Sequence, residues 1–346
     1  MLTLLEALHK QAVEEPERIY ASCAISADIE EGFRDITVRQ ILSAIDAFAW
    51  WLQGGWGRSE SFDNIAYVGP SDLRYAIFFY AAIKCGFKTL FVSPLNSLEA
   101  SRSIVETTEC LRIFYADPFA KVAKDLQSAA ASRNLEVAQI ASLDECLTAE
   151  STPYPYEKTF EEAKWDPIVI IHTSGTTDHA TDGQPQGLLK PMTMNFGFFS
   201  TPMEPLPPVP GYKDGSFNVF NRRTFLGPFP PFHLGGVYTM MTIPAYCAAT
   251  IVIPPPAAGP VSGDTLVKIM TKKKIEAMFS ATLPIEQTMR TPGGADKLKE
   301  MEFISFAGAP LPPWCGDELS KHTTVKTFCK PLSPLASPRP NPSRPS

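Results

Sequence analysis

Apolar residues return at helical spacing in two segments near the amino terminus. Within residues 2–13 and 37–51 they recur every three or four positions, so that one side of each segment is apolar and the other is polar. This periodicity predicts two amphipathic helices, and Thr37 has the position and the side chain of an N-cap residue.

Beyond residue 63, short apolar runs alternate with further helical patterns. Strands are predicted at 64–69, 89–92 and 111–115, and helices between them at 73–85 and 97–107. Ser71 is the expected N-cap of the first of these helices and Gly86 its expected C-terminal cap, while Asn96 or Ser97 should cap the second. Alternation of this kind is typical of an α/β fold, with mostly parallel sheets flanked by helices and ligands at the carboxyl ends of the strands.

The second half of the chain continues the alternation. Strand patterns at 225–232, 248–253, 275–279 and 303–306 are interleaved with helical patterns at 235–245 and 265–274. A polar connector is expected at 148–166 and a proline-rich surface loop at 201–214. We therefore expect one folded domain over residues 1–326, followed by a Ser/Pro/Arg-rich disordered tail at 327–346.

Residues 166–191 carry the most informative chemistry. A β-branched run, Ile168 to Ile171, predicts a buried strand that ends abruptly in a loop of hydroxyls and glycine. This loop consists of Thr173, Ser174, Gly175, Thr176 and Thr177. Such a loop after a strand presents backbone N–H groups and hydroxyls to a phosphate, and an ordinary polar turn is the alternative. The acidic stretch 178–186, for which a solvated surface loop is the simplest interpretation, separates it from Lys190.

Composition narrows the classes of function. The 346 residues carry a net charge of −6 without a basic stripe, and no apolar run is long enough to span a bilayer, so neither nucleic acid nor a membrane is an expected partner. The 7 cysteines lack CxxC spacing and the 5 histidines are equally dispersed, which argues against a zinc site. We predict no metal site from these residues, and reduced thiols in a cytoplasmic protein.

Several segments resemble adenylate-forming (AMP-binding) enzymes, and more narrowly the adenylation domains of fungal non-ribosomal-peptide-synthetase-like proteins. The segments that carry the resemblance are GFRDITVRQILSAIDAFAWWL, IAYVGPSDLRYAIFFYAAIKCGFKTLFVSPLNS, HTSGTT, GLLKP, PPFHLGG and FAGAPLPPWCGDELSKH. They match in order over about residues 30–325. The resemblance implies the amino-terminal part of the adenylate-forming fold.

The resemblance also implies a reaction of secondary metabolism. A carboxylic acid attacks the α-phosphate of MgATP, which gives an acyl-adenylate and pyrophosphate, and the acyl group then passes to the phosphopantetheine thiol of a carrier domain. The expected acid is an aryl, keto or amino acid, and the expected partners are carrier, reductase or thioesterase domains of a longer relative. The activity that the resemblance implies is that of an acid–thiol ligase.

Residues 173–177 match the phosphate loop of the family, which normally runs directly into Gly-x-Pro-Lys. Two alignments compete for that lysine. In one, the element is Gly183–Gly187 and Gln186 replaces the lysine; in the other, the element is Gly187–Pro191, Lys190 is the lysine and 178–186 is an insertion. We favour Lys190.

Two further short segments match motifs of the family. His233, with Gly235 beside it, corresponds to a motif that lines the acyl pocket, and a core histidine is the alternative. Gly308, Ala309 and Pro310 correspond to the turn that lies against adenine, and a simple strand-to-helix turn with Pro312 or Pro313 starting the helix is the alternative.

The family motif that holds Mg²⁺ is not recognisable after residue 327. The chain instead reads Cys329-Lys330-Pro331-Leu332, and the carboxyl-terminal lid with its catalytic lysine is also not found, so no catalytic residue is assigned. We therefore expect a truncated adenylation domain that turns over only as part of a longer protein. A catalytically inactive fragment with at most weak nucleotide binding remains the alternative.

Overall fold

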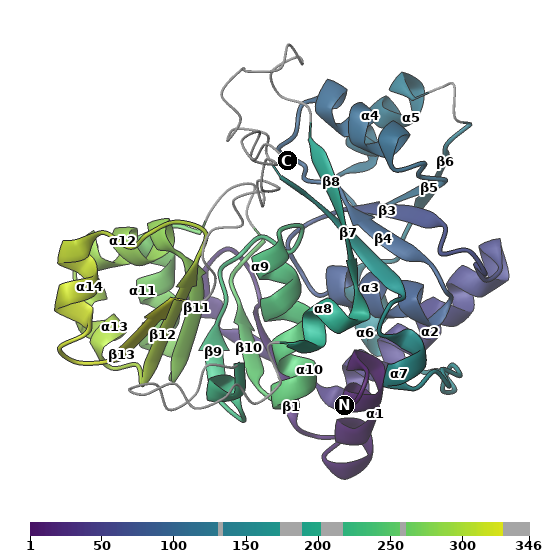
Figure 1. Cartoon of the computed structure of the whole chain (residues 1–346). Coiled ribbons are helices and arrows are strands. Elements are labelled where there is room, and N and C mark those ends of the chain that lie inside the picture. Colours follow the sequence, from purple (N-terminus) through teal and green to yellow (C-terminus); the bar gives the residue numbers. More distant parts are fainter. Residues whose placement is uncertain (131–133, 174–188, 202–216, 257–260, 328–346) are drawn as a thin grey trace, which may run out of the picture.

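The computed structural model of the chain describes residues 1–130, 134–173, 189–201, 217–256 and 261–327. Two sheets and the helices that flank them make up this part of the molecule (Figure 1). The predicted tail beyond its first residue, most of the predicted proline-rich loop and the stretch 178–186 lie outside the described residues.

The first sheet has six strands, and all but one of its neighbouring pairs are parallel. In spatial order the strands are β6 (Glu136–Gln139), β5 (Arg112–Tyr115), β3 (Asn64–Val68), β4 (Lys88–Phe91), β7 (Pro167–Thr173) and β8 (Lys190–Asn195). The exception is the edge strand β8, which runs antiparallel to β7. The four predicted strands of this sheet, β3, β4, β5 and β7, are confirmed.

The second sheet has seven strands, and again one neighbouring pair is antiparallel. In spatial order they are β13 (Thr324–Thr327), β12 (Phe303–Ala307), β11 (Ala277–Ala281), β9 (Thr224–Leu226), β10 (Thr250–Ile253), β1 (Ile19–Ala24) and β2 (Phe33–Thr37). Only β2 is antiparallel to its neighbour among these described strands. The prediction of mostly parallel sheets is thus confirmed, whereas β1, β2 and β13 were not predicted.

Helices form a layer between the sheets and a layer on the outer side of each (Figure 1). Those around the central layer include α1 (Leu4–Glu14), α2 (Val38–Trp56), α3 (Arg74–Lys84), α6 (Leu143–Thr148), α7 (Phe160–Ala163), α8 (Phe196–Ser200), α9 (Leu234–Val237) and α10 (Ile243–Cys247). The outer layers contain α4 (Leu98–Thr107) and α5 (Ala120–Ala129) on one side, and α11 (Gly263–Lys272), α12 (Thr282–Arg290), α13 (Gly294–Lys299) and α14 (Pro313–Leu319) on the other. Short 3-10 turns lie at Ile29–Glu31 and Phe217–Phe220.

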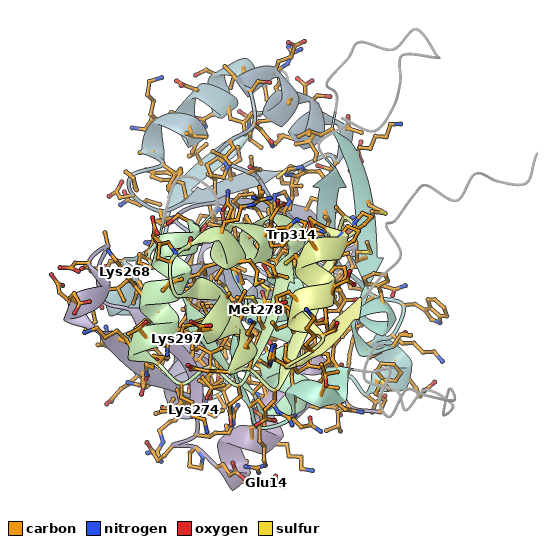
Figure 2. The ribbon with its side chains drawn as sticks, turned by 90° about the vertical axis from the view of Figure 1, so that its left-hand side faces the viewer. Glu14, Lys268, Lys274, Met278, Lys297 and Trp314 are labelled. Atoms are coloured by element: carbon orange, nitrogen blue, oxygen red, sulfur yellow. The ribbon has the colours of Figure 1, made fainter. Side chains whose placement is uncertain are left out.

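Both faces of each sheet are buried, which explains why the strands are apolar throughout. In β3, Ile65 and Tyr67 face the core between the sheets, while Ala66 and Val68 face α4 and α5. In the second sheet, Met278 of β11 lies beneath the outer helices, whose solvent side carries charged residues such as Lys268 (Figure 2). Alternate side chains therefore fill different cores, as expected for sheets covered on both sides.

The helix starts test the predicted caps. Thr37 accepts a hydrogen bond from the backbone of Gln40, and Ser97 accepts one from Ala100, so both predicted N-caps are confirmed. Pro313 is the first residue of α14, which agrees with the helix start expected at Pro312 or Pro313. Gly86 follows α3 with a φ of +80°, a conformation that glycine adopts without strain.

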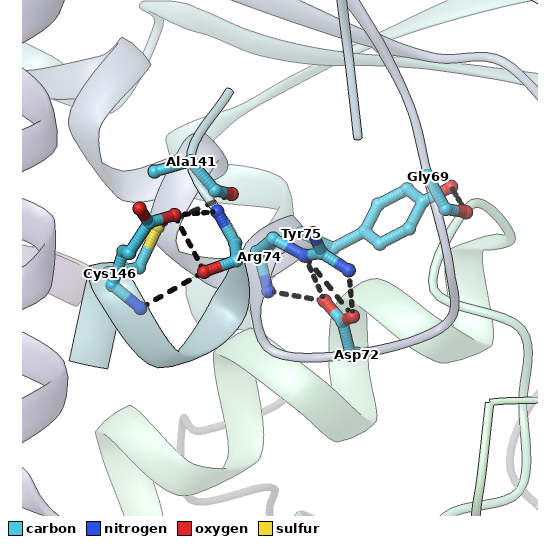
Figure 3. A network of polar contacts seen from close by, with 8 residues as sticks. Gly69, Asp72, Arg74, Tyr75, Ala141 and Cys146 are labelled. Atoms are coloured by element: carbon cyan, nitrogen blue, oxygen red, sulfur yellow. Dashed lines mark hydrogen bonds and ion pairs between the residues drawn. The ribbon is translucent and has the colours of Figure 1, made fainter. Parts of the chain in front are cut away.

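The prediction that Ser71 caps α3 is wrong. The helix begins at Arg74, two residues later than a cap at Ser71 would give, and its N-cap residue, Leu73, makes no side-chain cap bond. The carboxylate of Asp72 instead accepts a hydrogen bond of 2.9 Å from the backbone N–H of Arg74. The same carboxylate pairs with the Arg74 guanidinium at 2.6 Å, and Tyr75 donates to the carbonyl of Gly69 at 3.2 Å (Figure 3). A carboxylate near a helix N-terminus also interacts favourably with the helix dipole.

The predicted helix at 235–245 is divided into three parts. Between α9 and α10, residues Tyr238–Thr242 form a π-helical turn, η5. Two buried tyrosines bind its carbonyls: Tyr20 of β1 donates to Met240 and Tyr80 of α3 donates to Met241, both at 2.7 Å. The turn thereby joins α3 to the second sheet.

Every residue of α3 is buried, including the lysine at its end. The Lys84 ammonium group forms an ion pair with Asp46 of α2, and neither side chain is more than 4% exposed. Lys84 also lies 3.2 Å from Nε2 of His9 and donates to the carbonyl of Tyr154 at 3.3 Å. Burial lowers the pKa of Lys84, and the nearby Asp46 opposes that shift.

We predict that Asp46→Ala lowers the free energy of unfolding by about 3–5 kcal/mol, because it leaves the buried ammonium group without its partner. Replacing both partners, with Asp46→Leu and Lys84→Met, should cost much less than the single change, since neither charge then remains buried. Equilibrium urea unfolding measures both variants. Glu300→Ala removes an exposed ion pair with Lys297 and serves as the control. Equal stability of Asp46→Ala and the wild type would contradict this account.

Candidate functional site

The predicted phosphate loop begins at the end of an internal strand. Thr173 is the last residue of β7 and lies opposite Lys190, the first residue of β8. The two strands are antiparallel, so the backbone brings Thr173 and Lys190 together at the base of one loop. The base of this loop lies at the carboxyl edge of the first sheet. Ser174, Gly175, Thr176 and Thr177 lie outside the described residues.

Lys190 and Gln186 are the two candidates for the position of the phosphate-binding lysine. Its side chain is exposed, and the strand that it begins is at the edge of the sheet. Gln186 lies outside the described residues, so the choice between the two positions stays a prediction. Pro191 follows Lys190 within β8, which is compatible with an edge strand because proline cannot donate a ladder hydrogen bond.

His233 lies at the amino terminus of α9, where it is the N-cap residue. Its ring packs at 4.9 Å from the ring of Phe232, and much of its surface is exposed. Partial desolvation lowers the pKa of His233, which favours the neutral imidazole at neutral pH. The core-histidine alternative does not describe this exposed side chain.

Gly235 and Gly236 permit a close approach of the backbone. A Cβ atom at Gly235 would lie 2.5 Å from the ring of Phe229, and one at Gly236 would lie 2.1 Å from the carbonyl oxygen of Pro230. Both glycines therefore let α9 approach the 229–231 segment closely. A small cavity of about 40 Å³ next to this segment is lined by Phe229, Pro230 and Met240, among others.

His172, immediately before the predicted phosphate loop, is a buried residue that no sequence motif singles out. It lies on β7 in an otherwise aliphatic run and is only 4% exposed. Burial, followed by the nearby His233 and opposed by a hydrogen bond with the backbone of Phe91, lowers the pKa of His172 to about 4. The electrostatic influence of His233 on His172 indicates that the start of α9 and the end of β7 lie near one another.

Three aromatic rings connect the surroundings of the two histidines. We call Phe91, Tyr75 and Phe232 the aromatic bridge. The Tyr75 ring lies 5.0 Å from Phe91 and 6.5 Å from Phe232. The backbone of Phe91 bonds His172, and Phe232 packs against His233, so the aromatic bridge links β4, α3 and the start of α9.

The turn after β12 offers a different surface. Gly308 has a φ of +98°, and no atom lies within 4 Å of the position that its Cβ would occupy. Its backbone conformation, and not crowding, therefore favours glycine. Gly308, Ala309 and Pro310 are exposed and carry small or flat side chains, which is a suitable surface for a planar ring.

Other features of the described residues limit the chemistry. No group of three or more His, Cys, Asp or Glu side chains in the described ranges is arranged to hold a metal ion. A cavity of about 500 Å³, lined by Arg58, Lys158 and Asp166 among others, lies at the amino-terminal edge of β4 and β7, away from the predicted loop. No helix in the described part of the chain is both long and apolar enough to cross a membrane.

A sequence model of the family described as "AMP-binding enzyme" matches residues 8–329. The chain belongs to this family. The AMP-binding chain is 33% identical over 312 residues to an isocyanide synthase–NRPS hybrid, crmA, of Aspergillus fumigatus, a match that covers 87% of the chain and 19% of that protein. It is 28% identical over 341 residues to a carboxylic acid reductase of Neurospora crassa, covering 95% of the chain and 30% of that enzyme.

The predicted fold is confirmed by a solved structure. The inhibitor-bound amino-terminal domain of FACL13 from Mycobacterium tuberculosis superposes with a TM-score of 0.74 at 17% identity, covering 95% of this chain and 76% of that one. The AMP-binding chain therefore has the fold of the amino-terminal domain of adenylate-forming enzymes. It spans less than a third of the length of the two curated relatives.

The lowered pKa of His172 predicts a dependence of stability on pH. Between about pH 6.5 and pH 4 the unfolded chain binds a proton at this residue that the folded chain excludes, so the free energy of unfolding falls as the pH falls. The full decrease in the free energy of unfolding that this residue causes is on the order of 3 kcal/mol. Urea unfolding at pH 7 and pH 4.5 measures it, and His172→Gln should reduce the difference between the two.

The remaining pH dependence has other sources. The pKa values of His9 and His233 are also lowered, so a part of the loss should persist in His172→Gln. His322→Gln, at an exposed histidine, controls for the loss of an imidazole elsewhere. An unchanged pH dependence in His172→Gln would contradict the buried, neutral state assigned to His172.

Proposed function

We propose that this chain is the acid-activating part of an enzyme that uses ATP. A carboxylate oxygen of the acid attacks the α-phosphorus of ATP, the new bond joins acid and phosphate, and the bond to the leaving pyrophosphate breaks. The observation that supports this proposal best is the β7–β8 pair, which sets Thr173 opposite Lys190 at the base of the hydroxyl-rich loop in a member of the AMP-binding family. Phosphoryl transfer depends mainly on positioning and on charge neutralisation, which such a loop can provide.

The nucleotide binds at the carboxyl edges of the two sheets. Residues 173–177 and Lys190 bind the phosphates, and the open turn Gly308–Pro310 lies against the adenine. The turn suits this role because no side chain covers Gly308. The described residues by themselves do not form a site for Mg²⁺, so we assign no residue to the metal and route no step through it.

The acid binds beside His233, at the amino terminus of α9. A neutral imidazole there provides one N–H donor and one acceptor for a bound acid. Gly235 acts indirectly, because its lack of a side chain lets α9 pack on Phe229. Aryl, keto and amino acids are the candidate classes.

The next partner of the activated acid belongs to a longer protein. The chain is similar to parts of an NRPS hybrid and of a carboxylic acid reductase, which supports transfer to the phosphopantetheine thiol of a carrier domain and then to a reductase or thioesterase domain. This transfer, and a place in secondary metabolism, are part of the proposal.

Exchange of labelled pyrophosphate into ATP tests the activity. The purified chain is incubated with ATP and a panel of aryl, keto and amino acids, and its folding is checked by circular dichroism. Exchange that depends on one acid class supports the activating enzyme over a nucleotide-binding protein without turnover. A folded chain that binds neither ATP nor any acid would contradict the proposal.

Lys190→Ala should weaken ATP binding by roughly tenfold to a hundredfold, because a charged hydrogen-bonding partner of a phosphate contributes about 1.5–3 kcal/mol. Titration calorimetry measures the dissociation constant at fixed ionic strength. Lys268→Ala removes an exposed lysine on α11 and is the matched control for the change in net charge. Equal weakening in both variants would show that Lys190 acts only through net charge.

A further inference from the structure

We propose that the cavity of about 500 Å³ at the amino-terminal edge of β4 and β7 binds a free α-amino acid with an aromatic side chain. This ligand site is separate from the ATP and acid sites of the proposed function. The volume of the cavity lies within the range of about 300–1,000 Å³ that is usual for small-molecule sites. Charges of both signs and aromatic rings line it, and an aromatic amino acid carries groups that match both.

The loop that forms one wall of the cavity is held in place by its own hydrogen bonds. The backbone N–H of Ser59 donates to the carbonyl of Cys85 at 2.9 Å. The Ser59 hydroxyl bonds the carboxylate and the backbone N–H of Asp63, at 2.9 and 2.8 Å. A Cβ atom at Gly86 would lie 2.2 Å from the carbonyl oxygen of Ser59, so the loop lies directly on the end of α3. The wall is therefore preformed.

Phe62, in the same loop, has an unusual backbone conformation. Its φ of +57° is in the left-handed region, which a bulky residue other than glycine rarely adopts. Residues held in such conformations occur preferentially at ligand sites, where the surrounding structure maintains the strain. The ring of Phe62 lies 5.1 Å from the ammonium group of Lys158. With Phe87 and Tyr156, Phe62 gives the cavity an aromatic lining.

Arg58 supplies the positive charge that a carboxylate needs. Its guanidinium donates to the hydroxyl of Tyr154 at 3.2 Å and lies 5.6 Å from the centre of that ring, so Tyr154 orients it. A guanidinium has five N–H donors, and the bond to Tyr154 uses one of them. The remaining donors can bind a carboxylate in the bidentate geometry that arginine favours.

The other charges of the lining call for an ammonium group on the ligand. Lys158 and Asp166 form an ion pair of 2.6 Å and neutralise each other, and the lysine at the end of α3 is paired within the core. Glu60 and Glu157 are exposed and also line the cavity. These two carboxylates would repel a simple anion, whereas Arg58 would repel a simple cation. A zwitterion presents the opposite charge to both.

Calorimetric titration of the wild-type chain without ATP tests the ligand class. The probes are L-phenylalanine and L-tryptophan, for at least one of which we expect a dissociation constant of about 1 mM or tighter. Three analogues each lack one feature: 3-phenylpropanoate the ammonium group, phenylalaninamide the carboxylate, and L-alanine the ring. Each should bind roughly tenfold more weakly, because one charged or apolar contact is lost.

Exposed residues of the lining locate the ligand. Arg58→Gln should weaken binding of the aromatic amino acid by roughly tenfold, the effect of losing one charged hydrogen-bonding partner. The matched control is Arg102→Gln, which removes an exposed arginine of α4 and should leave the affinity unchanged. Urea unfolding checks that both variants are folded. With the amino acid bound, amides of residues 58–63 and 155–158 should exchange more slowly with solvent.

Three results would overturn the inference. A folded wild-type chain that binds neither aromatic amino acid would do so and would leave the proposed function standing. Equal affinity losses in Arg58→Gln and Arg102→Gln would reduce the effect to net charge. Unchanged affinity in Arg58→Gln, with slower exchange at α9 and at the end of β7, would place the amino acid at the acid site. That last result would support the proposed function against the separate site.

Discussion

Complete burial of α3 is the constraint on which the rest of the structure depends. The helix lies in the layer between the two sheets, and it has a charged residue at each end that must be neutralised. Asp72 pairs with Arg74 at its start and Asp46 pairs with Lys84 at its end. Because a buried unpaired charge is very unfavourable, these pairs fix the ends of α3 and the segments that carry the partners.

The same helix sets the geometry of the candidate site. Tyr75, in its first turn, packs against Phe91 of the first sheet and Phe232 beside α9, so it fixes the spacing between β4 and the start of α9. Tyr80, further along, donates to the π-helical turn that follows α9. The carboxyl edges of both sheets are therefore held by one buried element, while the β7–β8 pair presents the predicted phosphate loop at that edge.

The sequence predicted the elements whose patterns are strong. Helices with a clear apolar side and strands buried on both faces were found, and so were the caps at Thr37 and Ser97, because short hydroxyl side chains before a helical pattern have few other uses. The strands β6 and β8 were missed because both lie at an edge: β6 is largely exposed, and β8 contains Pro191. The Ser71 prediction was wrong because the ion pair between Asp72 and Arg74 depends on burial that no local pattern encodes.

The candidate site shows the same division between local patterns and tertiary contacts. The sequence motifs predict the loop that follows β7, Lys190, His233 and the turn at Gly308, since these depend on residue type and spacing, and their roles stay predictions. They do not single out His172, whose importance comes from burial, from its bond with the Phe91 backbone and from His233, which is distant in sequence. A histidine that interrupts an aliphatic run just before a polar loop was the one local signal.

Hydrogen exchange with and without ATP tests most directly whether the ligand site lies at the carboxyl edges of the sheets. Amides at the end of β7, at the start of β8 and in the turn 307–311 should exchange more slowly when ATP is bound. The opposite edge has the cavity of about 500 Å³ that is lined by Arg58, Lys158 and Asp166. Slowing confined to segments around that cavity, with β7, β8 and the turn unchanged, would contradict the account.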